Sequence, residues 1–338
     1  MMLPPGKIPP EILEKTVFKF LGAKRRDVIF GPSRGEDAAI VSDGCKLIVL
    51  HGDPISGATE KIGWIAMNIS TNDIATRGVK PCWALSCIML PKGSNEKILE
   101  KICREMSAAA KRLGVSIVGG HSEITLGLDH PLVIVFSMGV AEDDKYVTSS
   151  GAKPGSKIIL TKSGGIEGTA ILASDRGKIL MSRLGKELVR KAVDYFDRLS
   201  ILEEAMIAFE FGGVQAMHDP TEGGISNGLH EVADASKTGF RVYEEKIKIS
   251  PETSEICRFF EINPLNLISS GSLLIVAEQG KAAGIVDKIR EKGIDASIIG
   301  EVLADDKCRV IVRSNGTIET LVRPLSDELW TALTKEIQ

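Results

Sequence analysis

The chain has 338 residues, a net charge of −3, 43% hydrophobic residues and 26% charged residues, which is typical of a folded globular protein and favours two domains. The balanced charge excludes a basic surface for DNA or acidic lipid, and an aromatic content of 5% argues against single-stranded nucleic acid as a ligand. No apolar run approaches the roughly 20 residues that span a bilayer. We therefore expect no nucleic-acid partner and no membrane partner.

The first predicted element is an amphipathic helix over residues 9–21, preceded by the proline-rich MMLPPGKIPPE. That leading stretch has no charged-then-apolar signal pattern. The six cysteines are scattered and form no C-x-x-C pair. We expect reduced, mostly buried thiols, no zinc site and a cytoplasmic location.

A hairpin follows, with strands over Ala38–Val41 and Lys46–Leu50 and a turn at residues 42–44. Asp37 precedes the first strand, and Asp53 follows the second. Because the open ends of a hairpin lie side by side, we expect these two carboxylates to be neighbours. Like charges held together need a cation between them, and Mg²⁺ is the usual one.

The stretch from Gly63 to Pro81 predicts a helix in which Ile65 and Ile69 form an apolar stripe. Asp73 lies one turn further along that stripe, and Asn72 is beside it. A carboxylate that points into the core needs a positive partner or a metal. A surface aspartate at the end of a helix is the plain alternative.

Trp83–Met89 predicts a strand, Asn95–Leu113 an amphipathic helix, and Val115–Val118 a strand that ends at Gly119 and Gly120. Paired glycines after a strand allow a backbone to approach a phosphate closely. A simple turn is the alternative. Leu132–Val140 predicts a further apolar strand.

The polar, glycine- and proline-containing stretch 141–156 indicates a domain junction, with domains over residues 1–145 and 155–338. The second half opens with a strand over Lys157–Thr161 and a helix from Ile166. The free N–H groups of the intervening Ser163, Gly164 and Gly165 could hold an anion, or these residues could be a plain linker.

Further along, residues 183–211 are predicted to be mostly helical, and a helix over 225–236 could be capped by Asp219 or Thr221. A strand over 273–277, a helix over 282–292, a strand over 296–300, a hairpin across Asn315-Gly316 and a helix over 327–337 complete the chain. Strands and helices mix in both halves, so the predicted fold class is α/β or α+β with two domains.

The order of six short motifs resembles the aminoimidazole ribonucleotide synthase-related (PurM-like) superfamily, which includes thiamine-monophosphate kinase, selenophosphate synthase and the hydrogenase maturation protein HypE. The motifs are Gly35-Glu36-Asp37-Ala38-Ala39, Gly52-Asp53, Asn72-Asp73-Ile74-Ala75 to Pro81, Gly119-Gly120, Asp219-Pro220-Thr221-Glu222-Gly223-Gly224 and Ile299-Gly300-Glu301-Val302. They span roughly residues 30 to 325. The second half, which also contains Asn263-Pro264-Leu265, is most similar to HypE.

The resemblance implies an N-terminal domain whose strands pair with those of a second subunit in a dimeric β-barrel, and a C-terminal α/β domain. It implies ATP and Mg²⁺ as cofactors, with Asp37, Asp53 and Asp73 as metal ligands and Asp73 and Glu123 as catalytic residues. The implied cofactor-binding residues are Asp37, Asp53, Asn72, Asp73, Gly119, Gly120, Ser163, Gly164, Gly165 and Asp219.

The chain departs from the family pattern in four places. His121 replaces the acidic residue after the paired glycines, so either Glu123 substitutes for it or one metal site is weakened. His51 and Gly52 replace two threonines; His51 could contact phosphate, but we expect it to pack in the core. Glu222 replaces an arginine, which disfavours an anion. Residues 334–338, TKEIQ, lack the terminal cysteine of HypE.

We therefore expect an ATP- and Mg²⁺-dependent enzyme that phosphorylates, with or without dehydration, a small molecule or a carrier-bound group other than that of HypE. A catalytically weak nucleotide-binding partner in metalloenzyme maturation is the first alternative. A phosphotransferase similar to thiamine-monophosphate kinase is the second. Expected partners are ATP, an unidentified substrate, a second copy of the chain and another maturation protein.

Overall fold

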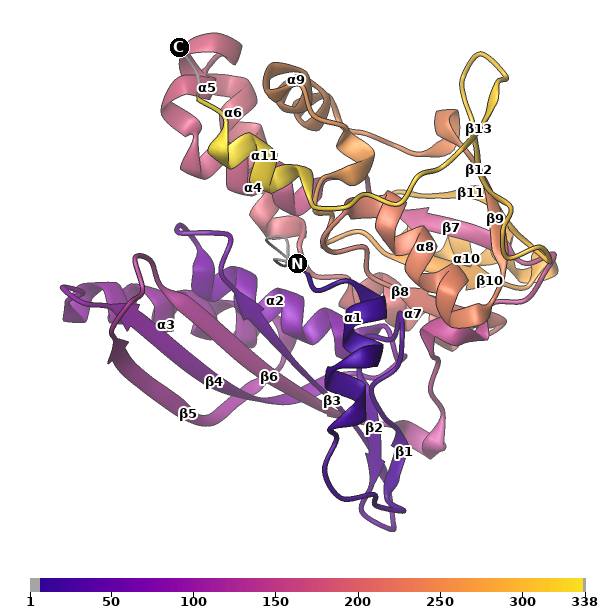
Figure 1. The fold of residues 1–338 in the computed structure, drawn as a ribbon, viewed down its shortest axis with the longest axis horizontal. Helices are drawn as coiled ribbons and strands as arrows, with labels where there is room; N and C mark the ends of the chain where they lie inside the picture. Colours follow the sequence, from indigo (N-terminus) through magenta and orange to yellow (C-terminus); the bar gives the residue numbers. More distant parts are fainter. Residues whose placement is uncertain (1–6, 337–338) are drawn as a thin grey trace.

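The computed structural model describes residues 7–336, without the side chain of Asp144. Residues 337 and 338, at the end where the sequence has no cysteine, lie outside this range. Two β-sheets form the centres of two domains, and the N-terminal segment lies at the junction between them (Figure 1). This confirms the mixed α/β class with two domains, while the exact boundaries remain a prediction.

The N-terminal sheet has six strands in the order β1-β2-β3-β6-β4-β5. Its strands are β1 (Val28–Phe30), β2 (Ala39–Ser42), β3 (Leu47–Ile55), β4 (Pro81–Pro91), β5 (Ser116–Thr125) and β6 (Leu132–Val140). The predicted hairpin is confirmed, since β2 pairs with β3 in antiparallel register from Ala39 opposite Leu50 to Ser42 opposite Leu47. All pairs are antiparallel except β4 with β5.

Helices α2 (Ile62–Ala75) and α3 (Glu96–Leu113) cover one face of this sheet (Figure 1). Helix α3 is amphipathic, begins at the Asn95 cap and ends at Gly114 in the left-handed conformation. Helix α2 is buried on almost all sides, because the C-terminal domain packs against it opposite the sheet.

The other face of the N-terminal sheet carries large apolar side chains exposed to solvent. Trp83 and Leu85 of β4 are 43% and 40% exposed, and Phe136, opposite Leu85 on β6, is 47% exposed. Contiguous apolar surface of this kind marks an interaction face.

The C-terminal sheet has seven strands in the order β13-β12-β9-β11-β7-β10-β8. Its strands are β7 (Lys157–Thr161), β8 (Val214–His218), β9 (Gly239–Tyr243), β10 (Leu274–Ala277), β11 (Ala296–Leu303), β12 (Arg309–Val312) and β13 (Ile318–Thr320). The β12–β13 hairpin is confirmed.

Helices cover both faces of this sheet. Helix α8 (Gly224–Ser236) packs on one face, and α7 (Leu202–Phe211) and α10 (Gln279–Glu291) pack on the other. The remaining helices share one apolar cluster with α2 and α3. They are α4 (Ile166–Asp175), α5 (Gly177–Leu184), α6 (Lys186–Val193), α9 (Pro251–Phe260) and α11 (Glu328–Thr334).

Three expectations about local structure were wrong. The predicted helix over residues 9–21 divides into α1 (Pro10–Lys15) and a 3₁₀ turn, Val17–Lys19. Strand β5 does not end at the paired glycines but continues to Thr125. The cysteines are free, as expected, but Cys257 alone among them is buried and Cys45 and Cys103 are exposed.

Candidate active site

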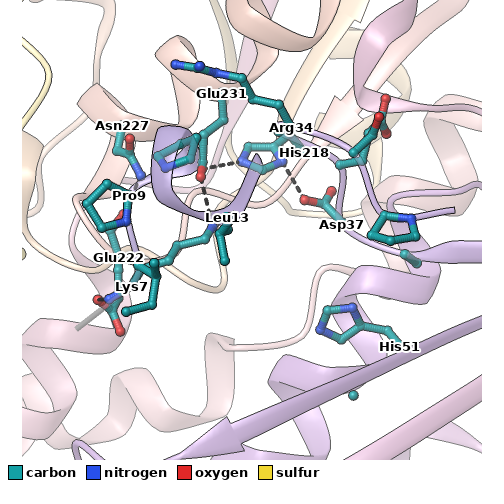
Figure 2. A pocket seen from close by; sticks show the side chains of 18 of the residues that line it. Lys7, Pro9, Leu13, Arg34, Asp37, His51, His218, Glu222, Asn227 and Glu231 are labelled. Carbon is teal, nitrogen blue, oxygen red and sulfur yellow. Dashed lines mark hydrogen bonds and ion pairs between the residues drawn. The ribbon is translucent and has the colours of Figure 1, made fainter. Parts of the chain in front are cut away.

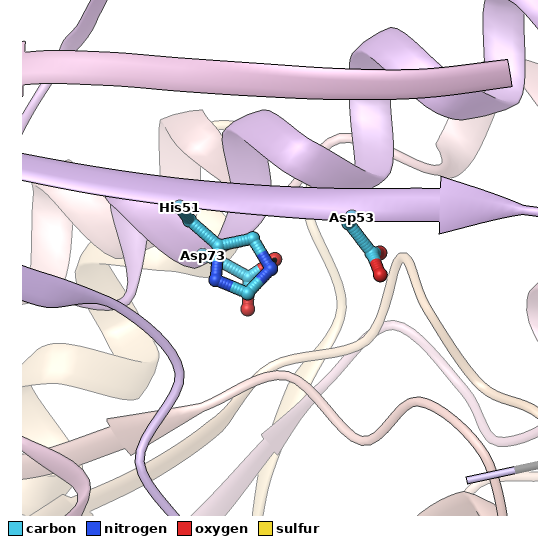
Figure 3. Close-up of side chains that lie close together, drawn as sticks. All are labelled: His51, Asp53 and Asp73. Carbon is cyan, nitrogen blue, oxygen red and sulfur yellow. Dashed lines mark ion pairs between the residues drawn. The ribbon is translucent and has the colours of Figure 1, made fainter. Parts of the chain in front are cut away.

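Four aspartates and one histidine converge where the two domains meet. Ligand atoms of His51, Asp53 and Asp73 lie within 4.8 Å of one another, and so do those of Asp37, Asp73 and Asp219. Figure 3 shows the first group, with His51 and Asp53 on β3 and Asp73 on α2. Because Asp73 belongs to both groups, the five side chains form one acidic cluster.

The local sequence explains how each side chain reaches the acidic cluster. Asp73 continues the buried stripe of α2, as predicted, and is 6% exposed. His51 and Asp53 are two residues apart on β3, so both point to the face that α2 covers. Asp219 directly follows β8 and does not cap α8, whose N-cap residue is Gly223. The capping interpretation of Asp219 is therefore wrong.

The acidic cluster is buried and carries more negative charge than its neighbours compensate. Asp219 is 1% exposed, and neither of its carboxylate oxygens has a hydrogen-bond partner. Burial, with a further contribution from neighbouring carboxylates, raises the pKa of Asp73 and Asp219 well above the usual range. Burial likewise raises the pKa of Asp53. Ionised carboxylates at this spacing are favourable only when a cation lies among them; otherwise they take up protons.

The donor set fits a hard divalent cation. Asp37, Asp73 and Asp219 offer only carboxylate oxygens, which are the ligands that Mg²⁺ prefers. The unpartnered oxygens of Asp219 are the atoms that such an ion would satisfy. His51, with Nε2 3.3 Å from Oδ2 of Asp73, adds one nitrogen donor at the edge.

A chain of alternating charges extends from the acidic cluster (Figure 2). Nδ1 of His218 lies 2.7 Å from Oδ1 of Asp37, and Nε2 lies 3.0 Å from Oε2 of Glu231. Nζ of Lys7 is 2.8 Å from Oε1 of Glu231. Burial alone would lower the pKa of His218, but the carboxylates of Asp37 and Glu231 raise it well above its ordinary value.

A buried arginine holds the loop that carries Asp37. The guanidinium of Arg77 is completely buried, with Nη1 2.9 Å from Oε2 of Glu36. Nε and Nη2 of Arg77 donate to the carbonyl oxygen of Ala38 at 3.2 and 3.1 Å. The backbone N–H of Ser149 donates to the same Glu36 carboxylate at 2.9 Å. The two residues that flank Asp37 in the sequence, Glu36 and Ala38, are thus both held in place.

A pocket of about 790 Å³ opens beside the acidic cluster. Asp37 and His51 line it from the N-terminal domain, and His218 and Glu231 line it from the C-terminal domain (Figure 2). The N-terminal segment from Lys7 onwards forms a third wall. The volume of the pocket lies within the range of small-molecule and cofactor sites.

Comparison with known proteins places the chain in a family. Residues 35–141 match the N-terminal domain model of AIR synthase related proteins, and residues 153–313 match the C-terminal domain model. The carbamoyl dehydratase HypE of Rhizobium leguminosarum bv. viciae is 31% identical over 72% of this chain and 69% of its own length. The chain belongs to the AIR synthase-related family.

Solved structures of HypE have the same fold as this member of the family. A crystal structure of a HypE-HypF complex covers 92% of this chain and 99% of its own, with 25% identity and a TM-score of 0.74. A crystal structure of HypE in complex with ATP covers 93% of this chain and 91% of its own, with 22% identity and a TM-score of 0.72.

Three residues that depart from the family pattern line the pocket: His51, Gly52 and Glu222. His51 is half-buried beside Asp73 and does not pack in the core, so that expectation was wrong. The Glu222 carboxylate accepts a hydrogen bond from the backbone N–H of Lys7 at 2.7 Å. Glu222 therefore contacts the N-terminal segment at the pocket.

Asn72 is next to Asp73 in sequence but serves the packing of the two domains. Its side-chain N–H group donates to the carbonyl oxygen of Leu199 at 2.9 Å, and its oxygen accepts from the backbone N–H of Ile201 at 3.1 Å. Both ends of the amide are used inside the protein, which leaves neither for a nucleotide.

The loop before α4 does not offer free N–H groups to an anion. The N–H of Gly164 donates to the carbonyl oxygen of Lys248 at 2.9 Å, and the N–H of Gly165 donates to Oγ of Ser269 at 2.8 Å. Ser163 is fully buried and accepts a hydrogen bond from Ser250. These three residues therefore fit the alternative, a plain linker, and not an anion site.

Strand β5 carries the remaining predicted residues away from the acidic cluster. A Cβ atom on Gly120 would lie 1.9 Å from the carbonyl oxygen of Ser86, so this glycine permits close strand pairing. Glu123 lies opposite Met89 and contacts His121 at 3.1 Å on the open sheet face. Strands β4 and β6 separate β5 from β3, so Glu123 and Gly119 do not reach the cluster within one chain.

Four residues of the site were missed by sequence reasoning: Arg77, Glu36, His218 and Glu231. Glu36 and His218 each precede a predicted site aspartate directly, which is a signal that could have found them. Glu231 lies on α8 and Arg77 lies in the turn after α2, and neither carries a local motif. Their roles follow from packing between distant segments.

Proposed function

We propose that this protein is an ATP- and Mg²⁺-dependent enzyme that transfers the γ-phosphoryl group of ATP to an oxygen atom of a small or carrier-bound substrate. The observation that carries the proposal is the buried acidic cluster of Asp37, Asp53, Asp73 and Asp219 beside a nucleotide-sized pocket. The ATP complex of a HypE with the same fold supports it.

In this proposal Asp37, Asp73 and Asp219 hold Mg²⁺, and Asp53 and His51 stand at its edge. The metal would supply charge neutralisation to the triphosphate. Arg77 and Glu36 keep the Asp37 loop in place. His218 fixes Asp37 from the C-terminal domain, so the metal ligands are assembled only when the two domains are docked.

We further propose that the protein acts in metalloenzyme maturation, as a homodimer and with a maturation-protein partner. The exposed apolar face that contains Trp83, Leu85 and Phe136 supports pairing with a second copy. The HypE relative and the HypE-HypF complex support the maturation context.

Among residues 7–336 no helix is long and apolar enough to cross a membrane.

A nucleotide-binding partner with little turnover is a second candidate. Glu222 and Glu231 both line the pocket, and carboxylates at that position oppose a polyphosphate. This candidate predicts nucleotide binding without product.

The test is release of ADP by the wild-type protein in the presence of Mg²⁺ and a panel of acceptors. The panel should include a carbamoylated thiol peptide and thiamine monophosphate, and Asp73→Asn is the matched inactive variant. Substrate-stimulated ADP release that Asp73→Asn abolishes is expected. Nucleotide binding with no turnover on any acceptor would favour the second candidate, and equal activity in Asp73→Asn would overturn the assignment of the site.

A further inference from the structure

Lys7 attaches the N-terminal segment to the C-terminal domain. Its backbone N–H donates to Oε2 of Glu222 at 2.7 Å, and its Nζ donates to Oε1 of Glu231 at 2.8 Å. Residues 8–11, which follow, line the pocket (Figure 2). The segment therefore passes across the pocket between the two domains.

Lys7 differs from the other cationic side chains at the pocket. Over residues 7–336 the lysines and arginines that line it are Lys7, Arg34 and Arg323. Arg34 and Arg323 both bind Asp234, at 2.9 and 2.8 Å. The Lys7 side chain is 49% exposed, and an ammonium group has three donors, so it can take additional acceptors.

Release of Lys7 would leave one buried contact of the Glu231 carboxylate in place. Glu231 is almost fully buried, and an unpaired carboxylate there would be costly. However, Nε2 of His218 lies 3.0 Å from its other oxygen. Glu231 therefore keeps its contact with His218 when Lys7 moves to a different acceptor.

A polyphosphate in this pocket would carry more negative charge than one divalent cation neutralises, and lysine is a common ligand for the excess. We propose that Lys7 is a phosphate ligand that the N-terminal segment brings to the nucleotide, exchanging Glu231 for a phosphate oxygen when the nucleotide binds. This inference rests on the proposed function, because it names a further residue of the same nucleotide site.

The inference is tested by isothermal titration of a nucleotide series into wild type, Lys7→Gln and Lys7→Arg. Lys15→Gln, in the last turn of α1, is the control on the same segment. The series is adenosine, AMP, ADP and a non-hydrolysable ATP analogue, each with Mg²⁺. Loss of one charge-assisted contact should weaken binding about tenfold or more.

We expect Lys7→Gln to weaken ADP and the ATP analogue but not adenosine, Lys7→Arg to restore most of the affinity, and Lys15→Gln to have no effect. An equal loss of affinity along the whole series would mean that Lys7 only closes the pocket, and unchanged binding would mean that Lys7 takes no part. Either result overturns this inference but leaves the proposed function standing. Failure of the wild type to bind any nucleotide would instead overturn the proposed function.

Discussion

Nδ1 of His218 lies 2.7 Å from Oδ1 of Asp37, and this contact joins the C-terminal domain to a residue that the N-terminal domain contributes to the acidic cluster. Although burial opposes ionisation of Asp37, the positive charge of His218 lowers the pKa of that carboxyl. Asp37 is therefore the ionised member of a cluster in which Asp73 and Asp219 have raised pKa values. If the proposed function is right, the metal ligands are assembled only when the two domains are docked.

Replacing His218 with glutamine should destabilise the protein strongly. The substitution leaves the buried carboxylates of Asp37 and Glu231 without a cation between them, which costs about 3–5 kcal/mol. Urea unfolding at pH 7 measures the effect, with His130→Gln on the exposed surface as the control. A loss below about 1 kcal/mol would show that the contact is not a buried ion pair.

Replacing Asp219 with asparagine should have opposite effects on the metal-free and metal-bound protein. Without metal the variant should be more stable than the wild type, because a buried, unpartnered carboxylate is removed. With Mg²⁺ the wild type should gain thermal stability and the variant should gain little. Melting temperatures measured with and without Mg²⁺ test this, with Asp129→Asn as the exposed control. Equal stabilisation of both proteins by Mg²⁺ would place the ion elsewhere.

The fold was largely predictable because its elements are local. The amphipathic pattern of α3, the hairpin turn at 42–44 and the apolar strand β6 are each specified within a few residues. Strand β5 was cut short because two glycines suggested a turn. In the structure Gly120 is what lets β5 approach Ser86 on β4, which depends on the neighbouring strand and not on the local sequence.

The acidic cluster was predictable in part. Asp73 follows from the stripe of α2, and Asp37 and Asp53 follow from the hairpin, although the structure links these two through Asp73. Asn72 and Ser163 looked equally functional, because no local pattern shows that Leu199 and Ser250 occupy their polar groups. The chain of contacts from Asp37 to Lys7 includes the pair Lys7 and Glu231, which are 224 positions apart, and could not be found from spacing.

Replacing Glu167 with glutamine should change how stability depends on pH. Burial raises the pKa of Glu167 to about 8, and its Oε2 has no partner. The folded protein therefore keeps the Glu167 proton at pH values where the unfolded chain has released it. This protonation contributes fully to the free energy of unfolding at low pH, and the contribution is lost as pH rises towards 8. The loss is on the order of 3–5 kcal/mol.

The measurement is the free energy of unfolding of wild type and Glu167→Gln between pH 5 and pH 9. The variant, which keeps the shape without an ionisable group, should lose less stability over this range. Parallel curves for the two proteins would show that Glu167 ionises normally in the folded state.

Replacing Phe136 with aspartate should prevent the proposed homodimer. Phe136 lies opposite Leu85 on the exposed apolar face of the N-terminal sheet, and a charge there cannot be desolvated cheaply. Sedimentation equilibrium should give a dimer for wild type and a monomer for the variant. The control is Phe20→Asp, at an exposed residue directly after the 3₁₀ turn, and this variant should remain dimeric. A monomeric wild type would contradict the assignment of this face.

The central claim is that the acidic cluster holds a metal-bound nucleotide. Isothermal titration of a non-hydrolysable ATP analogue, with and without Mg²⁺, into wild type and Asp73→Asn tests it most directly. Asp73 is shared by both groups of ligands, so its loss should remove Mg²⁺-dependent binding. Binding that is independent of Mg²⁺, or that persists unchanged in Asp73→Asn, would contradict the account.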